Sequence, residues 1–313
     1  MKDDIRVLTT SDEDLAQVGR LWQSIFPDWP IEQHRLERIL RAIPGHHFIN
    51  DNGFSLAFMS DAENGRLAIV GVLPEHRRKG IGTRLVKKTT EALKDAALAN
   101  GKELKSFELG SFTPRFFAQL LVETPAEVKT FFLNRGFNKS ADAGVKDYFK
   151  DIRHEIAPPE IMEKAAMTNI VFSPWTPEGY EECMTKQRAL FHWARAYETL
   201  AAFNQHHEVL VAFDPETNEQ IGWTLMCSHS AIVSDVHAFL PLLPSKDKTG
   251  LIAAVGVDEG ARGKGVGLAM VVKALENMRA RGIEGVFIDY VKIRDFYEKF
   301  GFEPYWEYES YIL

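Results

Sequence analysis

Hydrophobic positions along the chain predict the same series of elements twice. Short apolar runs rich in Val and Ile cover residues 66–72 and 251–257, and each run is typical of a β-strand. Each run leads through a glycine-containing turn into a stretch that we expect to be helical. In the second helical stretch, apolar residues at helical spacing predict one apolar face: Leu268, Val271, Val272, Leu275 and Met278. The pattern therefore predicts a strand-turn-helix unit that occurs twice.

The two glycine turns align without a gap. Residues 66–82 read RLAIVGVLPEHRRKGIG, and residues 251–267 read LIAAVGVDEGARGKGVG. The Val-Gly-Val tripeptide, one arginine and two glycines recur at a constant separation of 185 positions, as from Gly80 to Gly265. This agreement indicates an internal duplication.

A Gly-Phe pair follows each predicted helix. The glycines of these pairs are Gly136 and Gly301, which are 165 positions apart. Because the loops are separated by 185 positions, the first copy holds about twenty additional residues between loop and pair, and segment 111–125 is the candidate for them.

Length and composition agree with two folded domains. The chain has 313 residues, and a prior of about 150 residues per domain gives two. Apolar residues make up 45% and charged residues 26%, which is typical of globular proteins. The stretch between the copies is polar and contains Pro158 and Pro159. We therefore expect one domain over residues 1–157 and a second over residues 158–313.

Charge and cysteine content exclude several classes of protein. The N-terminal sequence MKDDIRVLTT does not resemble a signal peptide, and no run of 18 apolar residues occurs. The two cysteines, Cys183 and Cys227, give neither a metal-binding spacing nor a disulfide framework. The net charge of -7 argues against binding to nucleic acid or to anionic lipid. We expect a cytoplasmic protein with no metal, no membrane and no nucleic acid among its partners.

The glycine turns are candidate anion sites. A strand, a glycine turn and a helix direct unpaired N–H groups of the helix start at a bound phosphate, and basic residues add charge. The first turn offers Arg77, Arg78, Lys79, Gly80, Ile81 and Gly82, and the second offers Arg262, Gly263, Lys264, Gly265, Val266 and Gly267. Neither turn satisfies the Walker pattern, and Leu85 and Met270 stand where a dinucleotide fingerprint requires its third glycine.

These turns resemble the pyrophosphate-binding motif of the GNAT superfamily of N-acetyltransferases, and the resemblance covers both halves. A tyrosine four residues before Gly-Phe, a late signature of that family, is matched by Tyr297. The resemblance implies an α/β (α+β) fold of two consecutive GNAT domains, each a mixed, twisted sheet flanked by helices. It also implies acetyl-CoA as co-substrate, bound where two central strands splay apart. Gly71 and Gly256, inside the predicted strands, mark either a bulge, a close backbone approach or ordinary packing.

The same resemblance assigns chemical roles. Backbone groups of Val255 and Val257 would pair with the pantetheine arm, and the N–H of Val257 would face the acetyl carbonyl. Val70 and Val72 are their counterparts in the first half. Tyr297 would protonate the sulfur of CoA, although a core aromatic residue is the alternative at this position.

The general base is less defined. Asp289 ends the apolar run GVFID and is our candidate, and the alternatives are a solvated aspartate at a strand end or loss of the proton through water. Many family members carry asparagine seven residues before the tyrosine, whereas this chain has Tyr290. That contact to CoA is therefore not expected here.

The two halves differ at the signature tyrosine. Phe132 stands four residues before Gly136, so the first half has no hydroxyl there. We expect catalysis in the C-terminal half, while the first half either binds CoA or keeps the fold and supplies a wall of the acceptor site.

The acceptor is expected to be a small-molecule amine. The C-terminal stretch resembles amino-sugar acetyltransferases of fungi and bacteria, which makes glucosamine the leading acceptor. Phe191, Trp193 and Tyr197 either line an acceptor pocket or pack against the sheet. A polyamine, an aminoglycoside or a protein lysine is the alternative acceptor, and an acetyl-CoA-binding sensor without catalysis is the alternative function. The sequence leaves the oligomeric state open.

Overall fold

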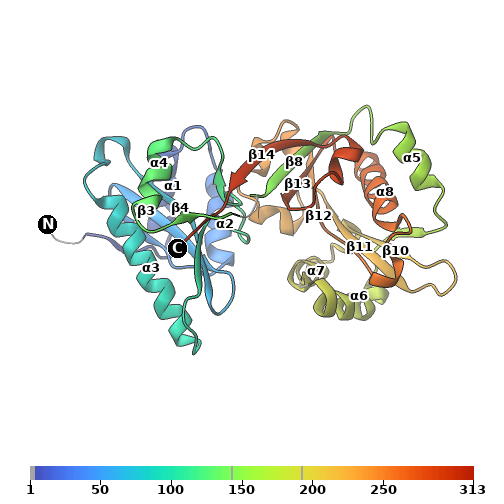
Figure 1. The fold of residues 1–313 in the computed structure, drawn as a ribbon, viewed down its shortest axis with the longest axis horizontal. Coiled ribbons are helices and arrows are strands. Elements are labelled where there is room, and N and C mark those ends of the chain that lie inside the picture. Colours follow the sequence, from blue (N-terminus) through green and yellow to red (C-terminus); the bar gives the residue numbers. More distant parts are fainter. Residues whose placement is uncertain (1–3, 142–143, 192) are drawn as a thin grey trace. The chain divides into compact units, whose positions relative to one another are not determined.

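Two β-sheets organise the chain, one in each of two units (Figure 1). The computed structural model describes residues 4–141, 144–191 and 193–313. Unit 1 contains Met1–Val145, Val236–Leu242 and Trp306–Leu313, and unit 2 contains Lys146–Asp235 and Leu243–Tyr305. Within the described residues, no helix is both long and apolar enough to cross a membrane.

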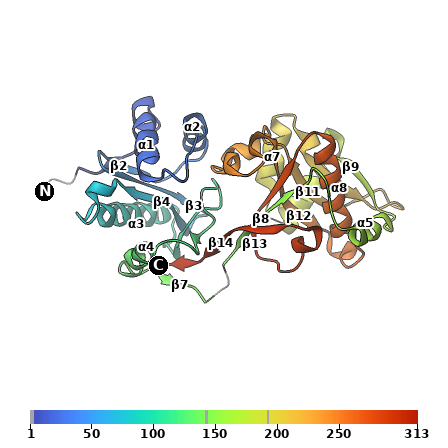
Figure 2. The ribbon, with the colours of Figure 1, turned by 90° about the horizontal axis from the view of Figure 1, so that it is seen from above.

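Unit 1 has a mixed sheet in the order β1-β2-β3-β4-β5-β15-β7, in which β4 and β5 are parallel. The strands are β1 (Arg6–Val7), β2 (Phe48–Asn50), β3 (Gly53–Met59), β4 (Asn64–Val72), β5 (Ser106–Leu109), β7 (Asn138–Lys139) and β15 (Tyr311–Ile312). One face is covered by α1 (Asp12–Ile25) and α2 (Gln33–Ala42), and the other by α3 (Ile81–Ala99) and α4 (Ala126–Leu133), as Figure 2 shows. A short strand, β6 (Leu120–Leu121), pairs with Tyr308 and Glu309.

The second sheet repeats this arrangement with the strand order β6-β14-β8-β13-β12-β11-β10-β9; it belongs to unit 2 except for β6 and the end of β14 from Trp306, which belong to unit 1. The strands are β8 (Lys146–Asp151), β9 (Val171–Pro174), β10 (Val209–Phe213), β11 (Gln220–Cys227), β12 (Thr249–Val257), β13 (Gly285–Val291) and β14 (Glu303–Glu309), of which β12 and β13 are parallel. Helices α5 (Pro159–Ala166) and α8 (Val266–Ala280) cover one face, and α6 (Tyr180–Lys186) and α7 (Ala194–Ala202) cover the other (Figure 1).

The predicted helix after the second glycine turn is confirmed as α8. Its predicted apolar face packs on the sheet, with Val271, Val272, Leu275 and Met278 buried in the core of unit 2 and Leu268 partly buried beside them. The predicted fold class, two domains of mixed sheet flanked by helices, is confirmed as well.

The closing strand of each unit comes from the other half of the sequence. In unit 1, β15 lies between β5 and β7, with Ile312 opposite Glu108. In unit 2, β8 pairs with β13 in antiparallel register, with Phe149 opposite Phe287. The predicted division at residue 158 follows the sequence repeats. The units of the structure are discontinuous, because the two repeats exchange their last strands and because Val236–Leu242 of the second repeat belongs to unit 1.

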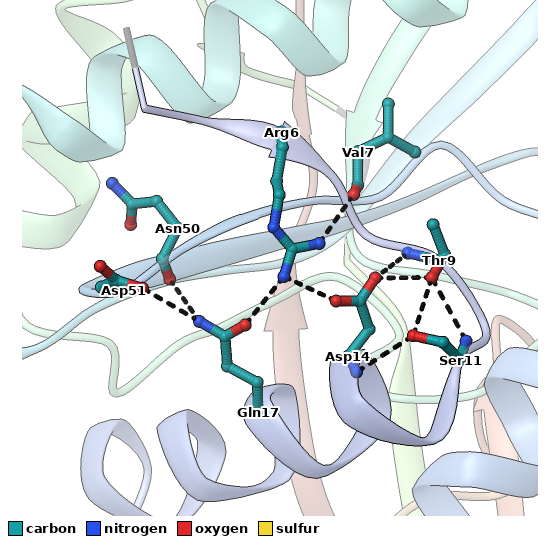
Figure 3. Close-up of polar contacts among 8 residues, drawn as sticks. All are labelled: Arg6, Val7, Thr9, Ser11, Asp14, Gln17, Asn50 and Asp51. Carbon is teal, nitrogen blue, oxygen red and sulfur yellow. Dashed lines mark hydrogen bonds and ion pairs between the residues drawn. The ribbon is translucent and has the colours of Figure 1, made fainter. Parts of the chain in front are cut away.

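The N-terminal strand of unit 1 is tied to α1 by a polar network (Figure 3). The Arg6 guanidinium lies 2.6 Å from Asp14 Oδ1 and donates to Gln17 Oε1 at 2.9 Å. The N–H and hydroxyl of Thr9 donate to Asp14 Oδ2 at 2.7 and 2.6 Å, and the Ser11 hydroxyl accepts the Asp14 N–H. Ser11 therefore caps α1, and the Asp14 carboxylate accepts from both Arg6 and Thr9.

Candidate functional site

Loop 1 (residues 77–82) and loop 2 (residues 262–267) follow the same backbone course. Gly80, with φ of 79°, and Gly265, with φ of 81°, are left-handed N-cap residues of α3 and α8. Two positions earlier, Arg78 and Gly263 are also left-handed, with φ of 62° and 77°. Glycine adopts this backbone without a steric penalty, which explains the glycines at both caps. The aligned sequences therefore fold into one loop conformation twice.

The helix starts leave backbone donors without helical partners. The Arg84 N–H bonds the Gly80 carbonyl at 3.1 Å, and the Ala269 N–H bonds the Gly265 carbonyl at 3.0 Å. These are the first bonds of each helix, so the N–H groups of residues 81–83 and 266–268 have no acceptor within it. Among the described residues, no side chain caps either helix. Together with the positive end of the helix dipole, these donors form an anion site.

One arginine anchors each loop to the strand before it. Arg77 Nε donates to the Val72 carbonyl at 3.1 Å, and Arg262 Nε donates to the Val257 carbonyl at 3.1 Å. Both arginines are exposed, as are Lys79 in loop 1 and Lys264 in loop 2. The loops therefore present positive side chains around the unpaired N–H groups.

The glycines of the two loops differ in the space around them. A methyl group added to Gly263 would meet no atom within 4 Å, and on Gly267 its nearest neighbour would be Val257 Cγ2 at 3.5 Å. In loop 1, a methyl group on Gly82 would lie 3.2 Å from Phe131 Cζ. The donor set of backbone N–H groups and cations suits the phosphates of CoA in both loops.

The parallel central strands part beside each loop. In unit 2, β12 and β13 are paired from Thr249 to Ile252, and residues 253–257 of β12 continue without β13. In unit 1, β4 and β5 are paired from Asn64 to Leu67, and residues 68–72 of β4 continue without β5 while residues 69–72 stay paired with β3. On the freed side, the carbonyls of Val72 and Val257 accept from Arg77 and Arg262, and the other backbone groups of that side face away from β3 and β11.

Val255 and Val257 direct backbone groups to that freed side. The Asp258 N–H bonds the Ile221 carbonyl, which lies on the β11 side of β12, at 2.9 Å. Because backbone direction alternates along a strand, the N–H groups of Val257 and Val255 point away from β11. Val70 and Val72 take the equivalent places on β4.

The two strand glycines allow close approach of side chains. A methyl group on Gly256 would lie 2.9 Å from two ring carbons of Phe191, and one on Gly71 would lie 2.9 Å from Ile25 and 3.0 Å from Phe26. Phe191 ends a π-helical turn, Gln187–Phe191, and stacks on Trp193 with ring centroids 5.1 Å apart and planes 12° apart. Close approach is therefore the structural reason for glycine at both positions.

Tyr297 is a buried aromatic residue of unit 2. Tyr297 begins a 3-10 turn, Tyr297–Phe300, and its side chain is buried among Phe296, Phe302 and Tyr148. Burial raises the pKa of the Tyr297 phenol, and the negative charge of Asp289 raises it further. The phenol therefore remains protonated at neutral pH.

The backbone around Asp289 differs from the predicted strand end. β13 continues to Val291, and the register with β8 shifts between Ile288 and Val291. Asp289 and Tyr290 therefore occupy a bulge within the strand, and Tyr290 has a φ of 54°. The bulge accommodates a half-buried polar residue where a regular strand would carry an apolar one.

The corresponding position of unit 1 has no acid-base group. Phe132 is 5% exposed and packs edge-on against Phe131 and Phe137 in the core. Tyr197, one of the aromatic candidates for an acceptor pocket, is fully buried, and its hydroxyl donates to the Ala254 carbonyl at 3.4 Å. Tyr197 thus packs beneath β12, whereas Phe191 and Trp193 are half-buried.

Sequence analysis missed two residues on the exchanged strand. Asp147 is 1% exposed, and its Oδ1 accepts the Tyr290 N–H at 2.8 Å. Tyr148 donates its hydroxyl to Glu298 Oε1 at 2.5 Å. No sequence signal links these residues to the second half, because their contact depends on the strand exchange.

Comparison with known proteins now identifies the family. The sequence model of the Acetyltransferase (GNAT) family matches residues 16–106 and 165–302, which together make up more than half of the chain. The chain belongs to this family. Its two matches correspond to the two repeats, and the family uses acetyl-CoA as co-substrate.

Solved structures share the two-domain fold. The chain superimposes with a TM-score of 0.84 and 24% identity on a GCN5-related glucosamine N-acetyltransferase region of a fungal multi-domain GH3 β-N-acetylglucosaminidase, over 99% of this chain and 38% of that one. A tandem GNAT protein from the clavulanic acid biosynthesis pathway gives a TM-score of 0.63 at 16% identity, over 99% and 97%. At these identities the likeness concerns the fold.

A short stretch resembles a curated enzyme more closely. Over 60 residues the chain is 42% identical to the mycothiol acetyltransferase of Beutenbergia cavernae, and the alignment covers 18% of this chain and 20% of that protein. The chain thus spans only a minor part of this relative and of the fungal multi-domain enzyme.

Proposed function

We propose that this chain is an N-acetyltransferase that moves the acetyl group of acetyl-CoA to the primary amine of a small molecule, and that the acceptor is an amino sugar such as glucosamine. One observation carries the proposal. Unit 2 combines loop 2 and the freed side of β12 with a buried tyrosine, Tyr297, whereas unit 1 has the loop and the freed strand but carries Phe132 in place of the tyrosine. Unit 2 is therefore our proposed catalytic unit.

Loop 2 is the proposed binding site for the diphosphate of CoA. Its support is the left-handed Gly265, the N–H groups of residues 266–268, and the cations of Arg262 and Lys264. The backbone of Val255 and Val257 would bind the pantetheine arm, because it faces the side from which β13 has diverged. The Val257 N–H would then donate to the acetyl oxygen as negative charge develops on it.

Bound acetyl-CoA supplies a thioester, whose C–S bond breaks as the acceptor nitrogen forms the new C–N bond. The acceptor must attack as the free amine, so one proton leaves nitrogen and one proton reaches sulfur. The products are an amide and the thiol of CoA, and the reaction needs no oxidant or reductant. The protein must therefore supply one acid, one base and one donor to the carbonyl oxygen.

Tyr297 is the proposed acid. Its reference pKa of about 10 is above that of a thiol, about 8.5, and burial raises the pKa of Tyr297 further. Complete proton transfer to a solvated thiolate would thus be uphill. A sulfur atom held in the same apolar surroundings is also desolvated, which raises the pKa of its thiol in the same direction. Tyr297 therefore donates a hydrogen bond to the leaving sulfur first and its proton as the charge develops.

Asp289 is the proposed base. It is half-buried in the bulge of β13, and its charge raises the pKa of Tyr297. The carboxylate would take the amine proton directly or through one water molecule. In an amino-sugar complex it would also hold the ammonium form of the incoming acceptor.

The stacked pair of Phe191 and Trp193 supports a sugar acceptor. The ring of Phe191 touches Gly256, between the two valines proposed to bind the pantetheine arm. Flat aromatic faces suit a sugar ring, which has apolar C–H faces and polar edges. The structural likeness to a glucosamine N-acetyltransferase region points to the same acceptor class.

For unit 1 we propose CoA binding without turnover. The support is that loop 1 repeats the conformation and the arginine anchor of loop 2, while Phe132 removes the acid. Calorimetric titration with CoA tests this directly. Two sites per chain are expected, reduced to one by Gly80→Ala, and a single site that survives Gly80→Ala would show that loop 1 only shapes the fold.

A thiol-release assay with acetyl-CoA tests the main proposal. Glucosamine, a polyamine, an aminoglycoside and a lysine peptide are compared, and mass spectrometry identifies the amide. We expect the highest kcat/KM with glucosamine. A higher value for another amine would reassign the acceptor. Tight binding of acetyl-CoA without thiol release above hydrolysis would favour the alternative function, a sensor.

A further inference from the structure

Strand β8 links the first sequence repeat to the proposed chemistry of unit 2. Its residues precede the boundary between the repeats, yet β8 lies between β13 and β14 in the sheet of unit 2. Two consecutive side chains of β8 contact the two segments that carry the proposed base and acid.

The first contact holds the bulge of β13. Tyr148 lies opposite Ile288 and Lys146 lies opposite Val291, so Asp147 alone faces two residues, Asp289 and Tyr290. A bulge of this kind leaves one residue without its regular partner in the ladder. The Asp147 carboxylate replaces that partner, because its Oδ1 accepts the Tyr290 N–H at 2.8 Å.

The bulge also sets the direction of Asp289. Ile288 and Val291 both belong to the apolar core that contains Tyr297, although they are three positions apart and regular alternation would place them on opposite faces. The extra residue thus changes the alternation at Asp289 and Tyr290. Tyr290 has a φ of 54°, which is unfavourable for a bulky side chain. A contact from outside the strand must therefore stabilise this conformation. Asp147, which is 1% exposed, provides it.

The second contact holds the turn of Tyr297. The Tyr148 hydroxyl donates to Glu298 Oε1 at 2.5 Å, and the rings of Tyr148 and Tyr297 lie 6.5 Å apart. Tyr148 is 3% exposed and Glu298 is exposed, so the bond ties a buried hydroxyl to a carboxylate at the surface of unit 2. A charge-assisted bond to Glu298 restrains the adjacent Tyr297.

We propose that Asp147 and Tyr148 are positioning residues for the reaction in unit 2, so that the first repeat supplies part of the catalytic geometry of the second. The inference rests on the proposed roles of Asp289 and Tyr297. Asp147 sets the backbone that carries Asp289, and Tyr148 sets the turn that carries Tyr297. Neither residue is required to touch the substrates.

The exchanged strand of unit 1 offers a matched control. Arg66 and Leu251 are equivalent positions of the two repeats, and they pair with Glu108 and Phe287 respectively. Glu108 and Phe287 are therefore equivalent positions as well. Ile312 lies opposite Glu108 as Phe149 lies opposite Phe287, which makes Tyr311 the counterpart of Tyr148. Tyr311→Phe removes the same hydroxyl from the same strand position in the unit without an acid.

The test uses the full chain with Asp147→Ala, Asp147→Asn, Tyr148→Phe and Tyr311→Phe, and measures kcat and KM for both substrates. We expect Asp147→Ala to lower kcat roughly 10- to 100-fold with KM for acetyl-CoA within about twofold, because small misplacement of reacting groups has effects of this size. Asp147→Asn keeps an oxygen acceptor and should recover most of the rate. Tyr148→Phe should lower kcat about 3- to 10-fold, and Tyr311→Phe should leave it within about twofold.

Amide hydrogen exchange of residues 285–291 gives a readout that needs no turnover. The Tyr290 amide should exchange faster in Asp147→Ala than in the wild type and in Asp147→Asn. Unchanged exchange, or a kcat within twofold of wild type in both Asp147→Ala and Tyr148→Phe, would overturn the inference. If Asp147→Ala does not fold, Tyr148→Phe decides by the same kinetic criterion. A wild-type chain without turnover on any amine would instead refute the proposed function, and exchange would still decide whether Asp147 holds the bulge.

Discussion

Replacing Gly256 by alanine tests the packing of Phe191 against β12. The added methyl group would lie 2.9 Å from Cε1 and Cζ of Phe191, whereas unstrained carbon contacts begin near 3.5 Å. The ring must therefore move by about 0.5 Å or more. Overpacking of this kind costs about 1–3 kcal/mol of unfolding free energy, which corresponds to a fall in Tm of roughly 3–10 °C for a domain of this size.

The effect on the KM for the acceptor should differ between glycine substitutions in the two units. Because Phe191 stacks on Trp193, its displacement in Gly256→Ala should raise KM for the acceptor several-fold while KM for acetyl-CoA changes less. Gly71→Ala is the matched control, since its methyl group would lie 2.9 Å from Ile25 and should cost similar stability in unit 1.

Steady-state kinetics and thermal melts of the two variants provide the measurement. The reasoning is refuted if Gly256→Ala leaves KM for the acceptor unchanged, or if Gly71→Ala raises it equally. An unchanged Tm in both variants would show that the neighbouring side chains yield without cost.

Three further predictions concern pH and the loops. Burial, with a smaller contribution from His46, lowers the pKa of His47 to about 3, so His47 is neutral in the fold. The unfolding free energy should therefore decrease as the pH is lowered from about 6.5 towards 3, because the unfolded chain binds a proton that the fold does not. Urea unfolding should show a loss of about 2 kcal/mol between pH 7 and 5, and a smaller loss in His47→Gln. The hydrogen bond from Arg6, with those from Thr9, lowers the pKa of Asp14 to about 2. The stability that the ionised Asp14 contributes is complete above pH 4 and should be lost as the pH falls through 2. Unfolding free energies should show a loss of about 2 kcal/mol in the wild type and no such loss in Asp14→Asn. Gly265→Ala forces alanine to φ of 81° and should raise KM for acetyl-CoA at least threefold, and an unchanged KM would argue against loop 2 as the diphosphate site.

Much of the fold was predictable because the repeats carry local signals. The strand, the left-handed glycine and the amphipathic helix are each encoded within a few residues, so the alignment of Gly80 with Gly265 predicted two equal loops. The exchange of β8 and β15 was not predictable, because each closing strand has the same local pattern whichever sheet it joins. Only its long-range partners distinguish the two arrangements.

The candidate site was less predictable. The sequence named Tyr297 and Asp289 separately, and their roles stay predictions, while the bulge that holds Asp289 depends on Asp147, which lies far away in the sequence. Tyr197 shows that a residue of the predicted acceptor segment can belong to the core instead. Its burial beneath β12 is decided by tertiary packing.

The kcat of Tyr297→Phe is the measurement that tests the central proposal most directly. With glucosamine and acetyl-CoA, we expect kcat to fall about 100-fold or more while KM for acetyl-CoA stays within about twofold, because the variant loses a proton donor and keeps loop 2. A Tyr297→Phe enzyme with wild-type kcat, together with loss of turnover in Gly80→Ala, would contradict the proposal and place catalysis in unit 1.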